Sequence, residues 1–537
     1  MWPALDTLSS VNRIHDGYVG ADVRTCWLVS KASYGAFLFK YILNSDYWHM
    51  TDYSADEANR KIQHAMACLL PERLHRRLRI CQSVQRLPAM YATVKSKCHD
   101  TSGQCQGCTC EKPGHSCCRK VVNFSHWPCK LVWRDASRGL ETIVKRHGGG
   151  NELWKLKHAI PELHAALEPL RRFQGATNRC THCHARKPEW QGLVADAGQM
   201  YEALAAKEVG KAIDRLLQKA VKATGVSTVT VVRHRSRRAY FGGSLIHRSD
   251  KTMTYEFAEL KACVLAALSA KYVSVGDRVV KMKGVPTGGF MSKIAASCVL
   301  VDAESKFKDR YFGHAGVPWT SRVAAKRYVD DLIWISNQIC LDCLKMQLKE
   351  AYPVKFDVAH EGETLHWLDI SFSLRTMTHT YRHRGFSTRP PWASTQASLR
   401  SYILGRLSRA NELQLDPRSS VDMVLHMLVD LHKCGWQHRH FRAVVHGSSG
   451  IDATGPLTAF RSAVRHLNEE ALLSLARSLQ SPADPADSRA ATDIASSDTS
   501  DSSDAQGTAD FTRLFPFTSM LLMICRPNFD REGCLCS

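Results

Sequence analysis

Apolar and polar residues follow each other along this 537-residue chain in patterns that predict helices and strands together. Apolar residues recur every three or four positions in "DEANRKIQHAMACLLPERLHRRL", which predicts a helix near the N-terminus. Helical patterns also cover 126–175 (interrupted by "HGGG"), 253–270, 341–351 and 395–470. Short strands are expected within 87–125, and "LHWLDISFSL" is expected to form one strand.

Three further segments place polar groups at the ends of apolar runs. Residues 193–220 predict a strand that ends at Asp196, a tight turn and an amphipathic helix. Glycines and a proline at 284–289 predict a flexible turn before a helix. Residues 324–336, "AAKRYVDDLIWIS", predict a strand, a turn and a strand. Adjacent aspartates at a hairpin tip can both approach one site, whereas side chains within a strand alternate between its faces.

Each of these segments also has a purely structural explanation. Asp is common at turns because its side chain hydrogen-bonds the local backbone. Asp196 could cap the following helix, with Gln199 completing a capping box. The glycine-rich turn could be an ordinary loop before a buried helix. The competing interpretation is metal-assisted phosphoryl transfer, in which carboxylates hold two divalent cations roughly 3.5–4 Å apart. Oxygen ligands of this type suit Mg²⁺.

Composition narrows the class of partner. The net charge is +21 and the isoelectric point is near 9.3, which favours polyanions, nucleic acid first and an anionic membrane second. The 44% hydrophobic content is typical of a soluble globular protein, and the length predicts two to four folding units. We expect neither a transmembrane helix nor a secretory signal, and hence an intracellular protein that is not secreted. Residues 478–510 are Ser- and Asp-rich with few large apolar side chains, and we expect them to be disordered.

The 20 cysteines, without a secretory signal, favour metal binding or buried thiols over disulfides. An insert at 98–118 has the Cys/His density of a zinc site, although its spacing matches no standard zinc finger. Its candidate ligands are Cys98, Cys105, Cys108, Cys110, His115, Cys117 and Cys118. Cys180 and Cys183 could complete that site or form their own. Cys340 and Cys343 are predicted to be core residues of an apolar helix.

The order of "LVADAGQMY", "GVPTGGFMS", "YVDD" and "LHWLDISF" resembles the palm of reverse transcriptases. It looks most like Penelope-like retroelements and, more distantly, telomerase and group II intron enzymes. The resemblance implies an α/β (α+β) right-hand polymerase with fingers, palm and a helical thumb. The implied domains are a helical N-terminal extension (1–86), fingers with the Cys/His insert (87–192), palm (193–375), basic thumb (376–475) and a tail (476–537).

The resemblance also assigns roles to individual residues. Asp196, Asp330 and Asp331 would be catalytic and would hold two Mg²⁺ ions. Tyr201 would lie under the sugar of the incoming nucleotide and select deoxynucleotides. The other nucleotide-binding residues implied are Lys95 or Lys97, Arg119, Gly288 and Gly289. "LPAMYATVKSKC" and "CRKVVNF" resemble the paired finger strands that carry the first three of these.

The implied function is an RNA-directed DNA polymerase, a nucleotidyltransferase of a retroelement. Its expected partners are an RNA template, a DNA or RNA primer and deoxynucleoside triphosphates, with no membrane, and in a eukaryote it would act in the nucleus. Lys281 and Lys293 stand where the family usually has Gln and Pro. The alternative is therefore a catalytically decayed, retroelement-derived nucleic-acid-binding protein with a zinc-binding insert.

Overall fold

The computed structural model describes residues 17–22, 25–30, 42–43, 45–78, 87–94, 118–124, 130–172, 178–233, 238–245, 251–315, 317–382, 391–451 and 454–478. These residues form two compact units. The first unit contains the described residues up to Leu368 together with Phe372–Met377. The second unit contains Asp369–Ser371 and the described residues from Thr378 onward. Almost all of the predicted tail lies outside the described residues, so its expected disorder is not tested.

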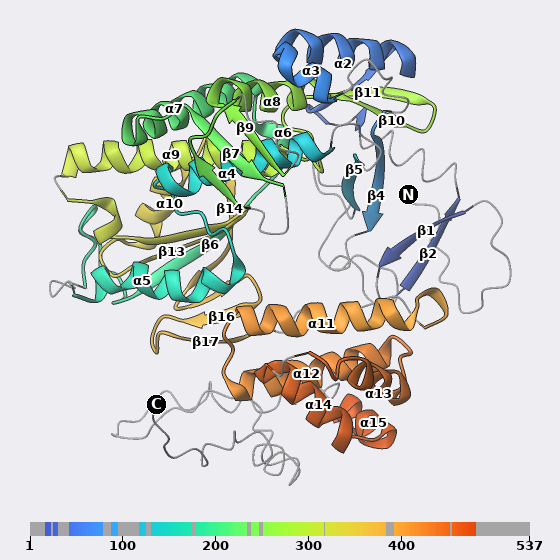
Figure 1. Cartoon of the computed structure of the whole chain (residues 1–537). Helices are drawn as coiled ribbons and strands as arrows, with labels where there is room; N and C mark the ends of the chain where they lie inside the picture. The colour runs from blue at the N-terminus through green and yellow to red at the C-terminus, as the bar shows by residue number, and fades with distance from the viewer. Residues whose placement is uncertain are drawn as a thin grey trace, which may run out of the picture. The chain divides into compact units, whose positions relative to one another are not determined.

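The first unit contains a four-stranded antiparallel sheet, which we call the central sheet (Figure 1). Its strand order is β12 (Ala324–Tyr328), β13 (Asp331–Ser336), β6 (Gln191–Ala197) and β14 (Phe356–Gly362). Strand β6 therefore occupies an inner position between β13 and β14. The near-continuous apolar run in β6 fits this place, because a strand covered on both faces needs no polar alternation.

Helices cover both faces of this four-stranded sheet. On one face, Leu193 and Trp334 belong to the main core with α9 (Ser292–Ala315) and α10 (Leu341–Ala351). On the other face, Val194 and Ile333 are also buried, and α5 (Ala159–Arg172) packs along β12. Helix α5 is amphipathic, with buried Ile160, Leu163, Leu167 and Leu170 at helical spacing. The sheet is thereby packed against helices on both faces.

Two short helices precede elements of this region. Helix η2 (Leu156–His158) lies before α5, and η3 (Trp319–Ser321) lies before β12.

A second, five-stranded sheet joins segments that are far apart in the sequence. Its order is β3 (Trp48–Thr51), β11 (Arg278–Met282), β10 (Tyr272–Val275), β4 (Ala89–Val94) and β5 (Cys118–Asn123). Strands β4 and β5 pair antiparallel on either side of the Cys/His insert, as the sequence predicts. Near the N-terminus, β1 (Gly17–Asp22) pairs with β2 (Thr25–Ser30), and α2 (Ala55–Leu69) precedes α3 (Glu72–Leu78).

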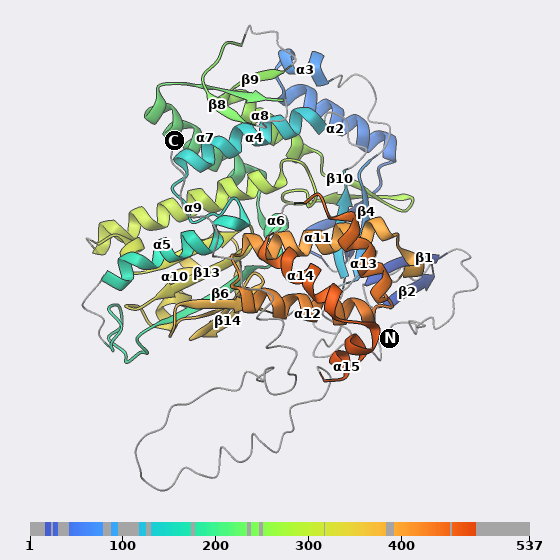
Figure 2. The same ribbon diagram turned by 60° about the horizontal axis from the view of Figure 1, so that its bottom comes forward.

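Helices α4 (Lys130–His147), α7 (Ala206–Thr224) and α8 (Phe257–Ser269) pack against one another beside α9 (Figure 2). The short helix α6 (Met200–Ala203) connects β6 to α7. A three-stranded sheet with the order β8 (Ala239–Phe241), β7 (Thr228–Val232) and β9 (Thr252–Glu256) packs on α4. The predicted amphipathic helix after β6 is confirmed as α7, whose Val209, Ile213 and Leu216 are buried.

The second unit is mainly helical. It contains β17 (Thr378–Tyr381), η4 (Pro391–Ala393), α11 (Gln396–Glu412), α12 (Pro417–Lys433), α13 (His438–Gly447), α14 (Gly455–His466) and α15 (Glu469–Ser478). Helices α12 and α14 lie side by side and share a core that includes Leu428 and Phe460 (Figure 2). The helical pattern over 395–470 is confirmed. None of the described helices in either unit has the length and apolar character that crossing a membrane requires.

The mixed α/β class with antiparallel sheets is confirmed, and several local predictions are wrong. The described part of the N-terminal 86 residues, which were expected to be helical, contains the strands β1, β2 and β3. The segment 253–270 begins as strand β9 before α8 starts at Phe257. "LHWLDISFSL" forms two strands, β15 (Thr364–Trp367) and β16 (Ile370–Ser373), because Leu368 adopts a left-handed φ of 53° that interrupts extended backbone.

Candidate active site and metal centre

The pairing of β6 with β13 brings the three predicted catalytic aspartates to one end of the central sheet. Asp196 and Asp331 are register partners, and the Ala197 N–H donates to the Asp330 carbonyl over 3.2 Å. Asp196 is exposed, while Asp330 and Asp331 are partly buried. Since Asp196 lies within β6, it does not cap a helix. The capping-box interpretation is wrong, and Gln199 makes no side-chain cap bond.

A fourth acidic residue, Asp357, was missed from the sequence. Strand β14 pairs with the other side of β6 and sets Asp357 opposite Asp196. Lys355 forms an ion pair of 2.6 Å with Asp357, and its side chain is 82% exposed. We call Asp196, Asp330, Asp331 and Asp357 the aspartate end of the sheet. Carboxylate oxygens are the donors that Mg²⁺ prefers, so the donor type suits magnesium. In the described residues, however, no three of these carboxylates lie close enough together to form one ligand group.

A two-residue hairpin loop carries Asp330. Tyr328 pairs with Asp331, which leaves Val329 and Asp330 as the loop. Val329 has φ of 62°, as the first position of a type I′ or II′ turn requires. A β-branched residue is strained in this region, at a cost of about 1–3 kcal/mol. The surrounding structure must hold the loop in this conformation.

Arg327 supplies that support from beneath the loop. Its side chain is 0% exposed, and its Nη1 donates to the Val329 carbonyl over 2.9 Å. Its Nε and Nη2 form ion pairs with Glu304 (2.7 Å) and Glu152 (3.1 Å). Glu304 also accepts from the Tyr352 hydroxyl at 2.9 Å. Because Glu304 lies on α9, the network ties the loop to the helix that follows the glycine-rich turn.

Burial sets the electrostatics of this network. Desolvation raises the pKa of Glu152, and the nearby Arg327 and the Ser297 hydroxyl only partly oppose that rise. Burial alone would lower the pKa of Arg327, but the carboxylates of Glu304 and Glu152 raise it overall. Burial also raises the pKa of Tyr352, and the charge of Glu304 adds to this effect. Arg327 therefore stays charged between two buried carboxylates. Sequence analysis missed the network, although an Arg within an apolar strand was a signal for it.

Tyr201 lies on α6, directly after the strand that carries Asp196. Burial raises the pKa of its hydroxyl to about 12, and the negative charge of nearby Asp330 adds to the rise. Its side chain packs against the main core, and its carbonyl accepts from the Val285 N–H at 2.7 Å. The structure thus sets Tyr201 between the core, the glycine-rich turn and the aspartate end.

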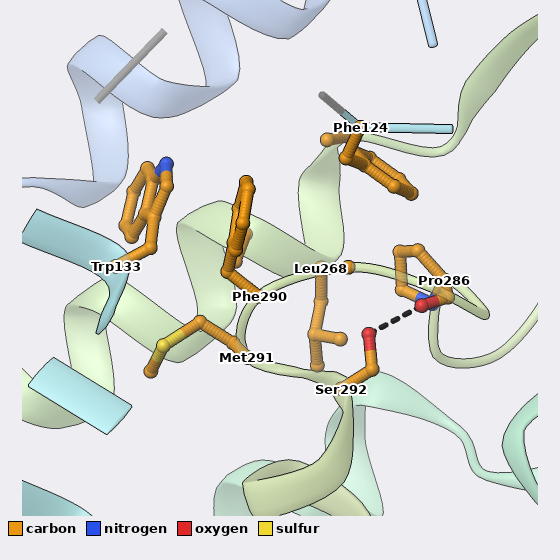
Figure 3. A pocket seen from close by; sticks show the side chains of 10 residues that line it. Phe124, Trp133, Leu268, Pro286, Phe290, Met291 and Ser292 are labelled. Atoms are coloured by element: carbon orange, nitrogen blue, oxygen red, sulfur yellow. Dashed lines mark hydrogen bonds between the residues drawn. The ribbon is translucent and has the colours of Figure 1, made fainter. Parts of the chain in front are cut away.

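The glycine-rich turn lies against strand β5. Gly288 has φ of 91°, and a Cβ placed there would meet the Val122 carbonyl oxygen at 2.4 Å. Ser292 opens α9, and its hydroxyl donates to the Pro286 carbonyl (Figure 3). Beside the turn, Phe124, Trp133 and Phe290 line a mainly apolar pocket (Figure 3). Gly289 also lines this pocket, so the turn is packed rather than loose.

Part of the predicted nucleotide and zinc sites lies outside the described residues. This holds for Lys95, Lys97 and, in the insert, Cys98, Cys105, Cys108, Cys110, His115 and Cys117. The backbones of Cys118 and Arg119 open strand β5 and pair with Val94 and Thr93. The roles of these residues remain predictions.

Four cysteines from two distant segments meet at one point of the first unit. The Sγ atoms of Cys180, Cys183, Cys340 and Cys343 all lie within 4.8 Å of one another, close enough to hold one ion. In the described ranges, no other group of three or more Cys, His, Asp or Glu residues has its ligand atoms this close together. Cys340 and Cys343 are buried in the main core, as predicted, but their place in this group was not expected. Two Cys-x-x-Cys spacings were the available signal, but only folding brings them together.

Comparison with known proteins gives structural likenesses only. No protein-family model and no curated protein matches the chain. Telomerase from Candida tropicalis is similar in structure (TM-score 0.43, 12% identity, 88% of this chain and 75% of that one). Telomerase from Candida albicans, solved with a fragment of telomeric RNA, is similar with a TM-score of 0.40, 11% identity and coverage of 84% and 73%.

An RNA-dependent RNA polymerase of a human picobirnavirus is also similar (TM-score 0.41, 8% identity, 83% of this chain and 85% of that one). At such scores and identities, these likenesses carry no argument about activity. The functional case therefore rests on the chain's own residues.

Proposed function

We propose that this chain is an RNA-directed DNA polymerase of a retroelement. The observation that carries the proposal is the register of β6 with β13, which sets Asp196 against Asp331 and the Asp330 loop at one end of the sheet. Asp196 and Asp330 would hold two Mg²⁺ ions, and Asp331 would support the hairpin. When bound, the ions activate a primer 3′-hydroxyl and stabilise the leaving pyrophosphate.

The residues around the aspartate end have positioning roles in this proposal. Tyr201, next to Asp330, would lie under the nucleotide sugar and select deoxynucleotides. Gly288 and Gly289 would let the backbone of the turn approach the nucleotide and template. Lys95 or Lys97, with Arg119, would bind the triphosphate. The net charge of +21 supports binding of the RNA template and the primer through their phosphates.

Primer extension tests the proposal. The wild-type chain is incubated with Mg²⁺, an RNA template, a DNA primer and deoxynucleoside triphosphates, in parallel with Asp330→Asn. The variant should extend at least about a hundredfold more slowly, because metal-ion catalysis contributes several kcal/mol to the barrier. Asp309→Asn, an exposed position on α9, is the matched control and should extend like the wild type. Equal extension by wild type and Asp330→Asn would contradict the proposal.

The choice of nucleotide and template distinguishes polymerase classes. Parallel reactions with ribonucleoside triphosphates and with a DNA template should be slower than the reaction on RNA with deoxynucleotides. Tyr201→Ala should reduce the preference for deoxynucleotides while leaving extension measurable. If ribonucleotides are the better substrate of the wild type, the chain is an RNA polymerase, and the RNA-directed DNA polymerase proposal is lost.

The second candidate is a catalytically decayed nucleic-acid-binding protein with a zinc-binding insert. Its support comes from Lys281 and Lys293, which stand where the resembled family usually has Gln and Pro. The Lys293 ammonium lies 5.9 Å from the centre of the Tyr328 ring, beside the aspartate loop. Under this candidate the chain binds a primer–template duplex but extends it no better than Asp330→Asn does. Duplex binding measured alongside the extension assay separates the two candidates.

A further inference from the structure

The four-cysteine cluster is built from a short turn before β6 and the N-terminus of α10. Cys180 and Cys183 belong to a turn that closes through the Cys180 N–H to the Ala185 carbonyl (2.8 Å) and the His184 N–H to the Cys180 carbonyl (2.9 Å). His184 takes a left-handed φ of 62°, which lets the chain reverse there. Cys340 caps α10 and Cys343 lies three residues later, in its first turn. Each pair is therefore presented by a rigid turn.

The distances fit a single tetrahedral ion. Zn–S bonds of about 2.3 Å set the sulfur ligands of a tetrahedral site about 3.8 Å apart. Here all four Sγ atoms lie within 4.8 Å of one another, and those of Cys183 and Cys340 are 3.4 Å apart. Three of the cysteines are buried, and Cys183 is exposed. One ion could enter from the Cys183 side and be enclosed by the other three.

Two backbone donors point at the sulfur of Cys180. The N–H groups of Cys340 and His182 donate to the Cys180 Sγ over 3.2 and 3.4 Å. The first of these bonds links the turn to the start of α10 directly. The N-terminus of α10 adds partial positive charge where Cys340 and Cys343 lie. Such donors stabilise thiolates, which are the form of cysteine that binds metal.

A core role or a disulfide does not explain this arrangement. Cys263 and Cys298 are buried in α8 and α9 as ordinary core thiols, and they belong to no such group among the described residues. All four cluster cysteines are free in the structure, and a disulfide would use only two of them. A set of four sulfurs leaves no open coordination position, which is typical of structural rather than catalytic zinc.

The cluster lies at the opposite end of the β6–β13 pair from the aspartates. The Thr181 N–H donates to the Gln338 carbonyl (2.9 Å), and Lys187 Nζ donates to the Asn337 carbonyl (2.6 Å). Gln191, which opens β6, is the register partner of Ser336. From there the strands run five residues, or about 17 Å, to Asp196 and Asp331. An ion at the cluster would fasten the base of the strand pair that carries the aspartates.

We propose that Cys180, Cys183, Cys340 and Cys343 bind one structural Zn²⁺ ion that joins the turn before β6 to the start of α10. Its four ligands include no residue of the Cys/His insert at 98–118, and the proposal does not depend on polymerase activity. The ion would hold the turn before β6 to the segment after β13 and so stabilise the register between the two strands.

Metal content tests the proposal in the full-length chain. Zinc is measured by mass spectrometry in wild type, Cys183→Ser and the Cys183→Ser/Cys343→Ser double variant, each purified under reducing conditions. We expect the double variant to hold one zinc ion fewer per chain than the wild type. Cys68→Ser, an exposed thiol on α2, is the control and should keep the wild-type content. The difference between variants counts this site even if the insert binds its own zinc. Equal zinc in wild type and double variant would overturn the proposal.

Cobalt substitution gives a second readout, which reports the geometry of the site as well as its metal content. Wild-type chain with its zinc replaced by Co²⁺ should show the visible bands of tetrahedral cobalt thiolate. Those bands should weaken in Cys183→Ser but not in Cys68→Ser. Removing the metal with a strong chelator should also lower the unfolding temperature of the wild type by at least about 5 °C. Cobalt bands that are identical in Cys183→Ser, or a chelated protein that unfolds at the same temperature, would contradict the site.

Discussion

Arg327 is the residue on which the candidate active site most depends, although it touches no predicted substrate. It is fully buried, it pairs with Glu304 and Glu152, and it donates to the carbonyl of Val329. A buried charge is costly unless it is paired and hydrogen-bonded. Here the ion pairs of Arg327 also hold the strained loop at Val329 and Asp330. The same side chain therefore affects both the free energy of folding and the position of Asp330.

Replacing Arg327 by Met should therefore destabilise the first unit strongly. The substitution leaves the two carboxylates buried without their cation, which costs about 3–5 kcal/mol. Urea denaturation followed by tryptophan fluorescence measures the loss, since Trp334 lies on the neighbouring strand. Lys326→Met is the control, because Lys326 pairs with the partly exposed Glu162, and solvent-screened pairs contribute about 0–1 kcal/mol. Similar losses in both variants would contradict a special role for Arg327.

Glu152 should give the first unit a dependence on pH. Its pKa is raised in the folded state, so its contribution to stability is fully present below pH 4.5 and is lost as the pH rises through the folded pKa. Glu152→Gln cannot ionise and should lack this decline, while its amide oxygen still accepts from Arg327. Urea midpoints measured from about pH 4.5 to 7 should fall more steeply for wild type than for the variant. Parallel curves would show that Glu152 does not titrate in this way.

At the scale of elements, the glycine-rich turn is fixed by close backbone contact. Gly288→Ala would place a Cβ 2.4 Å from the Val122 carbonyl oxygen, at a φ of 91° that disfavours any side chain. We expect a loss of at least about 1 kcal/mol in the free energy of unfolding. The matched control is Gly405→Ala in α11, where nothing lies within 4 Å and helix propensity predicts a gain of about 0.5–1 kcal/mol. A neutral Gly288→Ala would refute the close approach of the turn to β5.

The elements also show where periodicity succeeds and fails. Helix α7 was predictable because its apolar residues repeat at helical spacing over several turns. The break between β15 and β16 was not, since it depends on a left-handed residue, Leu368, that carries no local turn signal. Strand β9 was missed for a different reason, because its apolar residues run directly into α8 and the sequence shows no boundary between the two elements.

At the scale of the whole molecule, positive charge is the dominant property. With a net charge of +21, binding to a primer–template duplex should release many counterions and weaken steeply with salt. Raising KCl from about 50 to about 200 mM should lower the affinity at least about tenfold, as measured by fluorescence anisotropy. Asp330→Asn should show the same salt dependence, because it alters the chemistry and not the phosphate contacts. An affinity that does not change with salt would argue against nucleic acid as the partner.

The sequence by itself determined the mixed α/β class, the position of most helices and the ordered motifs around Asp196, Gly288 and Asp330. These features are local, because hydrophobic period and turn chemistry act over a few residues. Only the tertiary structure decided which distant groups meet. It set Asp357 opposite Asp196, enclosed Arg327 between Glu304 and Glu152, and joined Cys180 and Cys183 to Cys340 and Cys343. Such contacts depend on strand register and helix packing between separate elements, from 23 residues apart for Arg327 and Glu304 to 175 for Arg327 and Glu152, for which a single sequence carries no local signal.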